Sequence, residues 1–267
     1  MKKQILTYSI IAYSLTWLIA FGIFLRFKNG DISRHQLNVL HALAAIGPTC
    51  GALVTTYVFY GKIGVRRLIQ KIRFGKPTWN VLLFALSPIL FFVLGLFVYR
   101  VVKGDWYSFQ NFIGEHWSSY PVFLAWALPL FTYAIFEEIG WRGFLLPVLQ
   151  QKYSAWMATI YLTVIWALWH IPFFFYRFDF SLGISIGFFF GIFVGSMILT
   201  SIYNSTRGFL IPVILFHFLN NLCSGFDKEI IVAVLSIGFI FIAIYIFRKF
   251  GKANLSETER TMNYFKI

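Results

Sequence analysis

The stretch Phe136–Pro147, which reads FEEIGWRGFLLP, sets two adjacent carboxylates and an arginine among Trp, Phe, Leu and Ile. Only 12% of the 267 residues are charged and 59% are hydrophobic, whereas soluble domains carry about 25% charged residues. An ionisable side chain at membrane depth costs roughly 2.5 to 3.5 kcal/mol on insertion scales and usually marks function. The stretch therefore indicates a membrane protein with a polar site in its interior.

Eight uncharged apolar runs extend outward from this stretch, each near the roughly 17–25 residues that a helix needs to cross a bilayer. The run that ends at Phe136 is short unless its helix continues through Glu137 to Gln150, which we expect. The runs lack the period-two alternation of a transmembrane barrel. The sequence therefore predicts an all-α fold, a polytopic transmembrane helical bundle of about eight spans. The runs are Ile5–Leu25, Val39–Tyr60, Trp79–Tyr99, Tyr120–Phe136, Ser154–Tyr176, Phe180–Thr206, Gly208–Phe226 and Ile230–Phe247.

The distribution of basic residues predicts orientation and partners. The net charge is +13, but the basic residues lie in short gaps between apolar runs instead of on one polar face. Such loops meet anionic lipid headgroups on the cytoplasmic side, so we expect the lipid bilayer, and no nucleic acid, as partner. With eight spans in the cell membrane, both termini are expected in the cytoplasm. The most basic loop contains Lys62, Arg66, Arg67, Lys71, Arg73 and Lys76.

We expect one integral membrane domain over residues 1–267, with its motifs in a core at 120–225 and a polar, mobile tail from Asn254. No internal repeat and no domain boundary interrupts the apolar runs. The polar motifs that follow all fall within that core.

Helix geometry separates the two glutamates of the opening stretch. Successive helix residues point about 100° apart, so the two carboxylates cannot share one direction. Glu138 and Arg142 are four residues apart with the acid first, which is the favourable spacing for an ion pair. Glu137 is then left as an unpaired carboxylate that can act as a general base. The alternative is a structural ion-pair network at the membrane surface.

Two further segments carry polar groups. His170 precedes Pro172, which removes a backbone donor and forces local irregularity, a setting for a catalytic niche. The alternative for His170 is a packed or interfacial histidine. His217 and Asn221 are four residues apart on one helix face, and the alternative for them is a hydrogen bond that only joins two helices.

The expected helix lengths bring these groups to one depth. If the fourth helix extends to Gln150, Glu137 lies near its middle, as His217 does in its own run, and His170 lies slightly past the middle of another. All three side chains then meet near the midplane of the membrane. The predicted catalytic site consists of Glu137, Glu138, Arg142, His170, His217 and Asn221.

The order of these motifs resembles the CAAX protease and bacteriocin-processing family, also called CPBP or Abi, which includes the type II CAAX prenyl endopeptidases. The resemblance covers Phe136–Leu222 and rests on Glu-Glu-x-x-x-Arg, aromatic-x-x-x-His and His-x-x-x-Asn, each on its own hydrophobic segment. One departure is visible, since the second motif usually begins with Phe and here begins with Trp166. The replacement is conservative and leaves the histidine in place.

The resemblance implies an intramembrane endopeptidase that acts on a membrane-associated peptide or protein. Glu137 with His170 would activate water, His217 and Asn221 would stabilise the oxyanion, and the ion pair would hold the first motif. Amide hydrolysis needs such a base and such donors. The family includes CAAX proteases for prenylated substrates as well as bacterial members linked to bacteriocin processing and self-immunity, and the sequence leaves this choice open.

The sequence does not decide whether a metal takes part. The family is commonly labelled metalloprotease, and Glu137, His170 and His217 could ligate Zn²⁺ with an open position for water. However, the chain contains no His-Glu-x-x-His helix, the usual zinc protease motif. We favour glutamate-activated water without an obligatory metal.

Two non-enzymatic interpretations use the same residues. The buried Glu and His side chains could form a proton or ion path in a small transporter, or they could only lock helices together in a scaffold or immunity protein. Transporters often show repeated halves with broken helices in matching positions. The sequence shows no such symmetry, so the endopeptidase is the preferred prediction.

Overall fold

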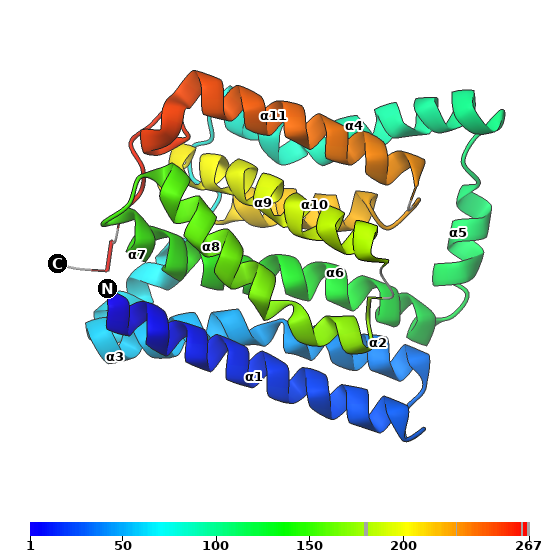
Figure 1. Cartoon of the computed structure of the whole chain (residues 1–267), viewed down its shortest axis with the longest axis horizontal. Coiled ribbons are helices and arrows are strands. Elements are labelled where there is room, and N and C mark those ends of the chain that lie inside the picture. The colour runs from blue at the N-terminus through cyan, green and yellow to red at the C-terminus, as the bar shows by residue number, and fades with distance from the viewer. Residues whose placement is uncertain (179–180, 228, 263, 266–267) are drawn as a thin grey trace.

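The computed structural model describes residues 1–178, 181–227, 229–262 and 264–265, and all regular structure in these ranges is helical. The all-α prediction is confirmed (Figure 1). The elements are α1 (Lys2–Lys28), α2 (Arg34–Ala44), α3 (Ile46–Gln70), α4 (Trp79–Lys103), α5 (Phe109–His116), α6 (Tyr120–Gly140), η1 (Trp141–Leu145), α7 (Leu146–Gln150), α8 (Ala155–Trp169), η2 (Ile171–Phe175), α9 (Leu182–Ser205), α10 (Ile211–Cys223) and α11 (Ile230–Asn254).

Seven helices within the described residues are long and apolar enough to cross a membrane, which fits a multi-pass membrane protein. The seventh predicted run, Gly208–Phe226, forms only the 13-residue helix α10. The reason is local, because Arg207 and Gly208 adopt positive φ values of 57° and 87°, a conformation that no α-helix continues. The polytopic bundle is confirmed, with one helix shorter than expected.

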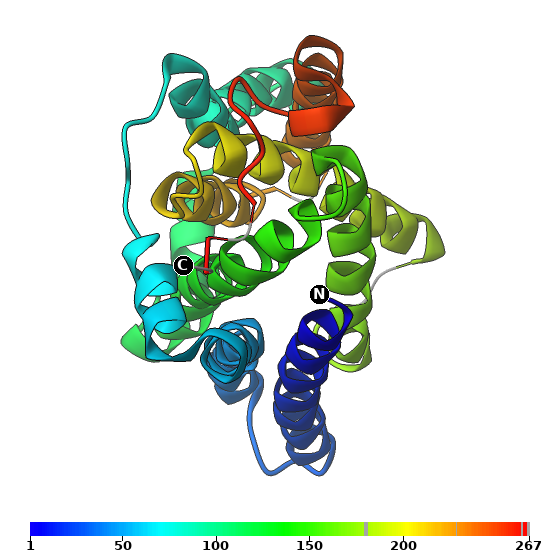
Figure 2. The ribbon, with the colours of Figure 1, turned by 90° about the vertical axis from the view of Figure 1, so that its left-hand side faces the viewer.

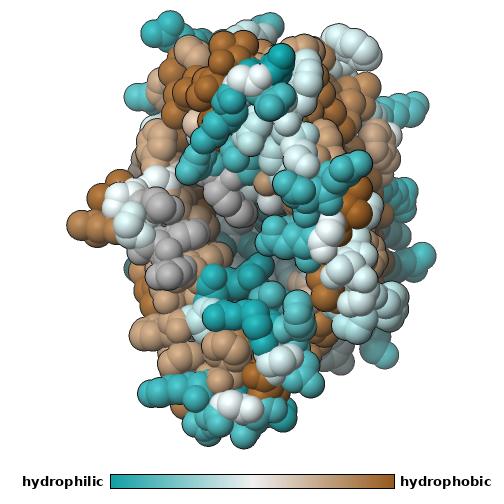
Figure 3. All heavy atoms as spheres, turned by 90° about the vertical axis from the view of Figure 1, so that its right-hand side faces the viewer, coloured by the Kyte–Doolittle hydropathy of each residue, from teal (hydrophilic) through white to brown (hydrophobic). Residues whose placement is uncertain are grey.

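The outer surface of the bundle suits lipid contact. Large apolar side chains are exposed along several helices, including Leu18 at 74%, Leu90 at 64% and Phe241 at 66%. In water such exposure would create apolar patches that soluble proteins avoid. Figure 3 looks onto the right-hand end of the molecule in Figure 1 and shows hydrophilic residues gathered over the middle of that end.

Helix α6 lies in the middle of the bundle, between α2 and α3 on one side and α10 on the other (Figure 1). The close approach to α3 requires a glycine at position 140. A Cβ atom there would lie 2.4 Å from Cβ of Pro48 and 2.7 Å from its carbonyl oxygen. One turn earlier, the hydroxyl of Thr49 donates to the carbonyl of Phe136 at 2.6 Å. These contacts fix the backbone beside the glutamate pair.

The fourth predicted helix continues through the glutamate pair as expected. Helix α6 passes into the π-helical turn η1 and then α7, so that Tyr120–Gln150 forms one candidate span of 31 residues. π-helical turns inside α-helices are rare, and those that occur are often found at functional sites. Here η1 contains Arg142, the partner of Glu138.

The segment that follows α11 differs from its prediction. Polar composition predicts a mobile tail, but Leu255 is fully buried and Phe265 is 2% exposed. Hydrogen bonds hold this segment to the ends of α7 and α9, including one from the Gln150 side chain to the carbonyl of Thr261 at 2.8 Å. Composition did not predict these contacts, because it does not report on distant residues; residues 263, 266 and 267 of the predicted tail lie outside the described residues.

Candidate active site

The ion pair of the first motif forms in the interior of the bundle. Nη1 of Arg142 lies 2.9 Å from Oε1 of Glu138, and both side chains are fully buried. Nη2 of Arg142 donates to the hydroxyl of Ser196 on α9 at 3.2 Å. The guanidinium carbon also lies 4.5 Å from the ring centroid of Trp166, within range of a cation–π interaction. Arg142 therefore joins α6, α8 and α9.

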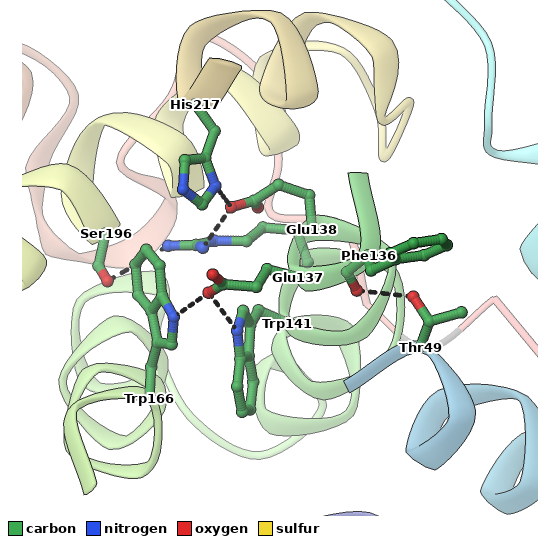
Figure 4. A network of polar contacts seen from close by, with 9 residues as sticks. Thr49, Phe136, Glu137, Glu138, Trp141, Trp166, Ser196 and His217 are labelled. Carbon is green, nitrogen blue, oxygen red and sulfur yellow. Dashed lines mark hydrogen bonds and ion pairs between the residues drawn. The ribbon is translucent and has the colours of Figure 1, made fainter. Parts of the chain in front are cut away.

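His217 contacts the second glutamate of the pair. Its Nδ1 lies 2.7 Å from Oε1 of Glu138, so this one oxygen has both Arg142 and His217 as partners (Figure 4). The other carboxylate oxygen of Glu138 has no hydrogen-bond partner among the described residues. The network ties α10 to α6 across the interior of the bundle.

Glu137 has different partners, as helix geometry predicts for adjacent residues. Its Oε2 accepts a hydrogen bond from the indole Nε1 of Trp141 at 3.0 Å and a second from the indole Nε1 of Trp166. Figure 4 shows these two bonds converging on one oxygen. Within the described residues no cation forms an ion pair with Glu137, which is 1% exposed. Two neutral donors thus hold this buried carboxyl group.

His170 lies where α8 ends and η2 begins. Its Nδ1 is 2.8 Å from the carbonyl oxygen of Trp166. A carbonyl oxygen can only accept, so Nδ1 carries the proton and Nε2 is the nitrogen left for another partner. No hydrogen bond joins His170 to Glu137 in the part of the chain that the structure describes. Trp166 connects the two residues, because its carbonyl oxygen contacts His170 and its indole N–H contacts Glu137.

Trp166 lies between the polar groups of the site. Its ring centroid is 5.9 Å from that of His170 and 5.8 Å from that of His217. Its indole N–H contacts Glu137 and its ring face lies against Arg142. The sequence prediction treated Trp166 as a conservative replacement for Phe, but a phenyl ring has no N–H donor. The departure from the family motif thus adds a contact.

Sequence reasoning also missed Trp141 and Ser196. Trp141 follows Glu137 by four residues, a spacing that puts both side chains on one helix face, so this contact was open to prediction. Ser196 comes from a distant apolar helix, and nothing in its local sequence marks it. Asn221, one turn after His217 on α10, is half-buried and stays outside the hydrogen-bonded network among the described residues.

The predicted groups thus gather from three helices, with one exception. Glu138, Arg142 and His217 form one network, and Glu137 and His170 meet around Trp166. Asn221 is near in sequence to this cluster without a bond to it. Trp166 therefore links the glutamate pair on α6 to His170 at the end of α8.

The arrangement does not fit a zinc site. Among the described residues no three or more His, Cys, Asp or Glu side chains are grouped so that they could hold a metal ion. Structural and catalytic zinc sites use at least three such protein ligands in tetrahedral geometry. Here Glu138 is bound to Arg142 and His217, and Glu137 to two indoles.

Known proteins with similar sequence support the family indicated by the motifs. The model of the family described as "Type II CAAX prenyl endopeptidase Rce1-like" matches residues 118–223. A protein of Methanococcus maripaludis named "CAAX prenyl protease 2" is 38% identical over 96 residues. That match covers 33% of this chain and 35% of the relative, so the chain matches about a third of the relative's length. Residues 118–223 are therefore similar to type II CAAX prenyl endopeptidases of the Rce1-like family.

Proposed function

We propose that this chain is an intramembrane endopeptidase in which Glu137 activates water for hydrolysis of a peptide bond. The observation that carries the proposal is the contrast between two adjacent buried carboxyl groups. Glu138 is bound to Arg142 and His217, whereas the donors to Glu137 among the described residues are the neutral indoles of Trp141 and Trp166. A general base must be able to take up a proton, and an ion-paired carboxylate resists this.

The proposed reaction gives each of these groups one role. Glu137 removes a proton from water as the water oxygen forms a bond to the carbonyl carbon of the peptide. Nε2 of His170 accepts a hydrogen bond from the second O–H of the water, which keeps that hydrogen, and so orients the nucleophile. When the tetrahedral intermediate collapses, the C–N bond breaks and the amine leaves with the proton that Glu137 held. No other reactant is needed.

The developing oxyanion needs donors. The Nδ1 contact with Glu138 leaves Nε2 of His217 on the other side of the ring, where an N–H would face the developing oxyanion. The amide of Asn221, one turn along the same helix, supplies a second donor. Loss of one such donor reduces kcat by about 10²- to 10³-fold in hydrolases with an oxyanion hole.

The substrate that we propose is a membrane-associated peptide or protein with a CAAX-type end. Support comes from the family match and from the similar protein named "CAAX prenyl protease 2". Processing of bacteriocin-type peptides is the alternative substrate class. We further infer a single membrane domain over residues 1–267 of a multi-pass protein in the cell membrane, with the catalytic core at 120–225 and both ends of the chain in the cytoplasm.

An open apolar groove between α6 and α10 supports a substrate presented from the membrane. It has a volume of about 190 Å³ and lies between α6, which carries Glu138, and α10, which carries His217. All its lining side chains are apolar, so it suits an apolar part of a substrate that lies in the bilayer. They belong to Phe131, Ala134, Ile135, Ile211, Ile214, Leu215 and Phe218.

The proposal is tested by hydrolysis in H₂¹⁸O. The full-length chain is placed in liposomes with farnesylated and non-farnesylated CAAX peptides and with a bacteriocin-type precursor peptide. Mass spectrometry should find one ¹⁸O atom in the new carboxyl group of the cleaved peptide, with faster cleavage of the farnesylated one. Faster cleavage of the precursor peptide would overturn the proposed substrate class. Intact peptides, with ion or proton flux in the same liposomes, would contradict the enzyme and favour a transporter.

A further inference from the structure

The segment after α11 crosses the end of the bundle at which α3, α7 and α9 finish. Residues 255–262 and 264–265 are here called the strap. Figure 2 looks onto this end and shows the strap as the red trace that runs from α11 toward the middle of the molecule. The strap lies outside residues 118–223, the part of the chain that matches the CAAX protease family.

Two buried amides anchor the middle of the strap. Gln150 at the end of α7 and Asn204 near the end of α9 exchange two hydrogen bonds of 2.9 Å. Asn204 also accepts from the backbone N–H of Thr261 at 3.1 Å and, through its carbonyl, from the hydroxyl of Thr258 at 2.6 Å. The guanidinium of Arg260 donates to the carbonyl of Gln150 at 3.1 Å. Such bonds between backbone and buried side chains fix the path of the strap.

The aromatic end of the strap contacts η1 directly. The hydroxyl of Tyr264 donates to the carbonyl of Gly143 at 2.6 Å. Burial raises the pKa of Tyr264 above its ordinary value, so the hydroxyl keeps its proton and remains a donor. The ring centroid of Phe265 lies 5.1 Å from that of Tyr60 on α3 and 5.6 Å from that of Phe144 in η1.

A continuous series of ring contacts leads from the strap to the proposed base. Phe144 stacks on Tyr8 at 5.2 Å, and Tyr8 meets the edge of Trp141 at 5.6 Å. The indole of Trp141 in turn donates to Glu137. Each of these rings is fully buried. Because packed interiors transmit small displacements, a shift of η1 would move a donor of Glu137.

We propose that Tyr264 and Phe265 are positioning residues for the catalytic site. By holding η1, the strap fixes the indole of Trp141 and the guanidinium of Arg142, and through them both glutamates. This inference rests on the proposed function, because it assigns the strap a role in that reaction. Displacements of about 1 Å in a catalytic group can reduce the rate by about a hundredfold, so a segment that acts only through η1 can still affect the rate.

The test compares Tyr264→Phe and Phe265→Ala with the matched control Tyr245→Phe in the full-length chain. Tyr245 is an exposed tyrosine on α11 whose hydroxyl accepts a hydrogen bond from Lys249. We expect kcat to fall about fivefold in Tyr264→Phe, the factor for one neutral hydrogen bond. Phe265→Ala should reduce kcat further, and Phe265→Leu should have a kcat between those of Phe265→Ala and the wild type. KM should stay near its wild-type value in every variant.

Hydrogen exchange of residues 141–146 provides a readout that does not depend on cleavage. Faster hydrogen exchange of residues 141–146 in Tyr264→Phe, with wild-type exchange in the control, would support the proposal that the strap holds η1. Wild-type exchange and wild-type kcat in Tyr264→Phe would overturn the proposal, as would an equal loss in the control. If Phe265→Ala does not fold, Tyr264→Phe still tests the proposal, because it removes the hydroxyl of Tyr264 and keeps the packed ring. If the wild type cleaves no peptide, the proposed function is contradicted. Wild-type hydrogen exchange of residues 141–146 in Tyr264→Phe would separately contradict the positioning role of the strap.

Discussion

Replacement of Trp166 by Phe tests the part of the site that departs from the family motif. Trp166→Phe keeps an aromatic ring beside Arg142, His170 and His217 but removes the indole N–H that donates to Glu137. A hydrogen bond to a charged group contributes about 1.5–3 kcal/mol, and each 1.36 kcal/mol changes a rate by about tenfold. The base keeps the second donor, from Trp141.

We therefore expect kcat to fall roughly tenfold to a hundredfold in Trp166→Phe with KM little changed. The assay is cleavage of a fluorogenic membrane-anchored peptide in proteoliposomes, with kcat and KM measured separately. The matched control is Trp156→Phe in the same helix, because that ring packs on Phe193 and Phe247 away from the site. Wild-type kcat in Trp166→Phe, or an equal loss in the control, would refute the role of this indole.

Two further predictions concern stability. Glu138→Gln should lower the free energy of unfolding by about 3 kcal/mol or more, because it leaves a buried guanidinium without its charged partner; an unchanged melting temperature in detergent would show that the ion pair does not hold the site. Gly140→Ala should lower the free energy of unfolding by about 1–3 kcal/mol, because the new Cβ meets the backbone of Pro48. The control Gly191→Ala meets no atom within 4 Å, and equal melting temperatures for the two variants would contradict the close packing of α6 on α3.

The fold was predictable because membrane helices carry their signal in local composition. Long apolar runs predict the positions of the membrane helices. The expected continuation of the fourth helix to Gln150 matches the structure. The short α10 was not predictable from hydropathy, since its start depends on two positive φ values at Arg207 and Gly208. Local backbone conformation, which hydropathy does not report, sets that boundary.

The candidate site was predictable within one helix and less so between helices. The pairing of Glu138 with Arg142 follows from their spacing of four residues. By contrast, the contact of His217 with Glu138 and that of Trp166 with Glu137 depend on how α10 and α8 rotate against α6. Sequence spacing contains no information on that rotation.

The central claim is that Glu137 is the base, and the variant Glu137→Gln tests it most directly. The amide is nearly the same shape as the carboxyl group and its oxygen can still accept from the two indoles, so the melting temperature should stay near that of the wild type. Cleavage of the membrane-anchored peptide should fall at least about a hundredfold, because general-base catalysis contributes 10²- to 10⁴-fold. Wild-type turnover by a folded Glu137→Gln protein would contradict the account.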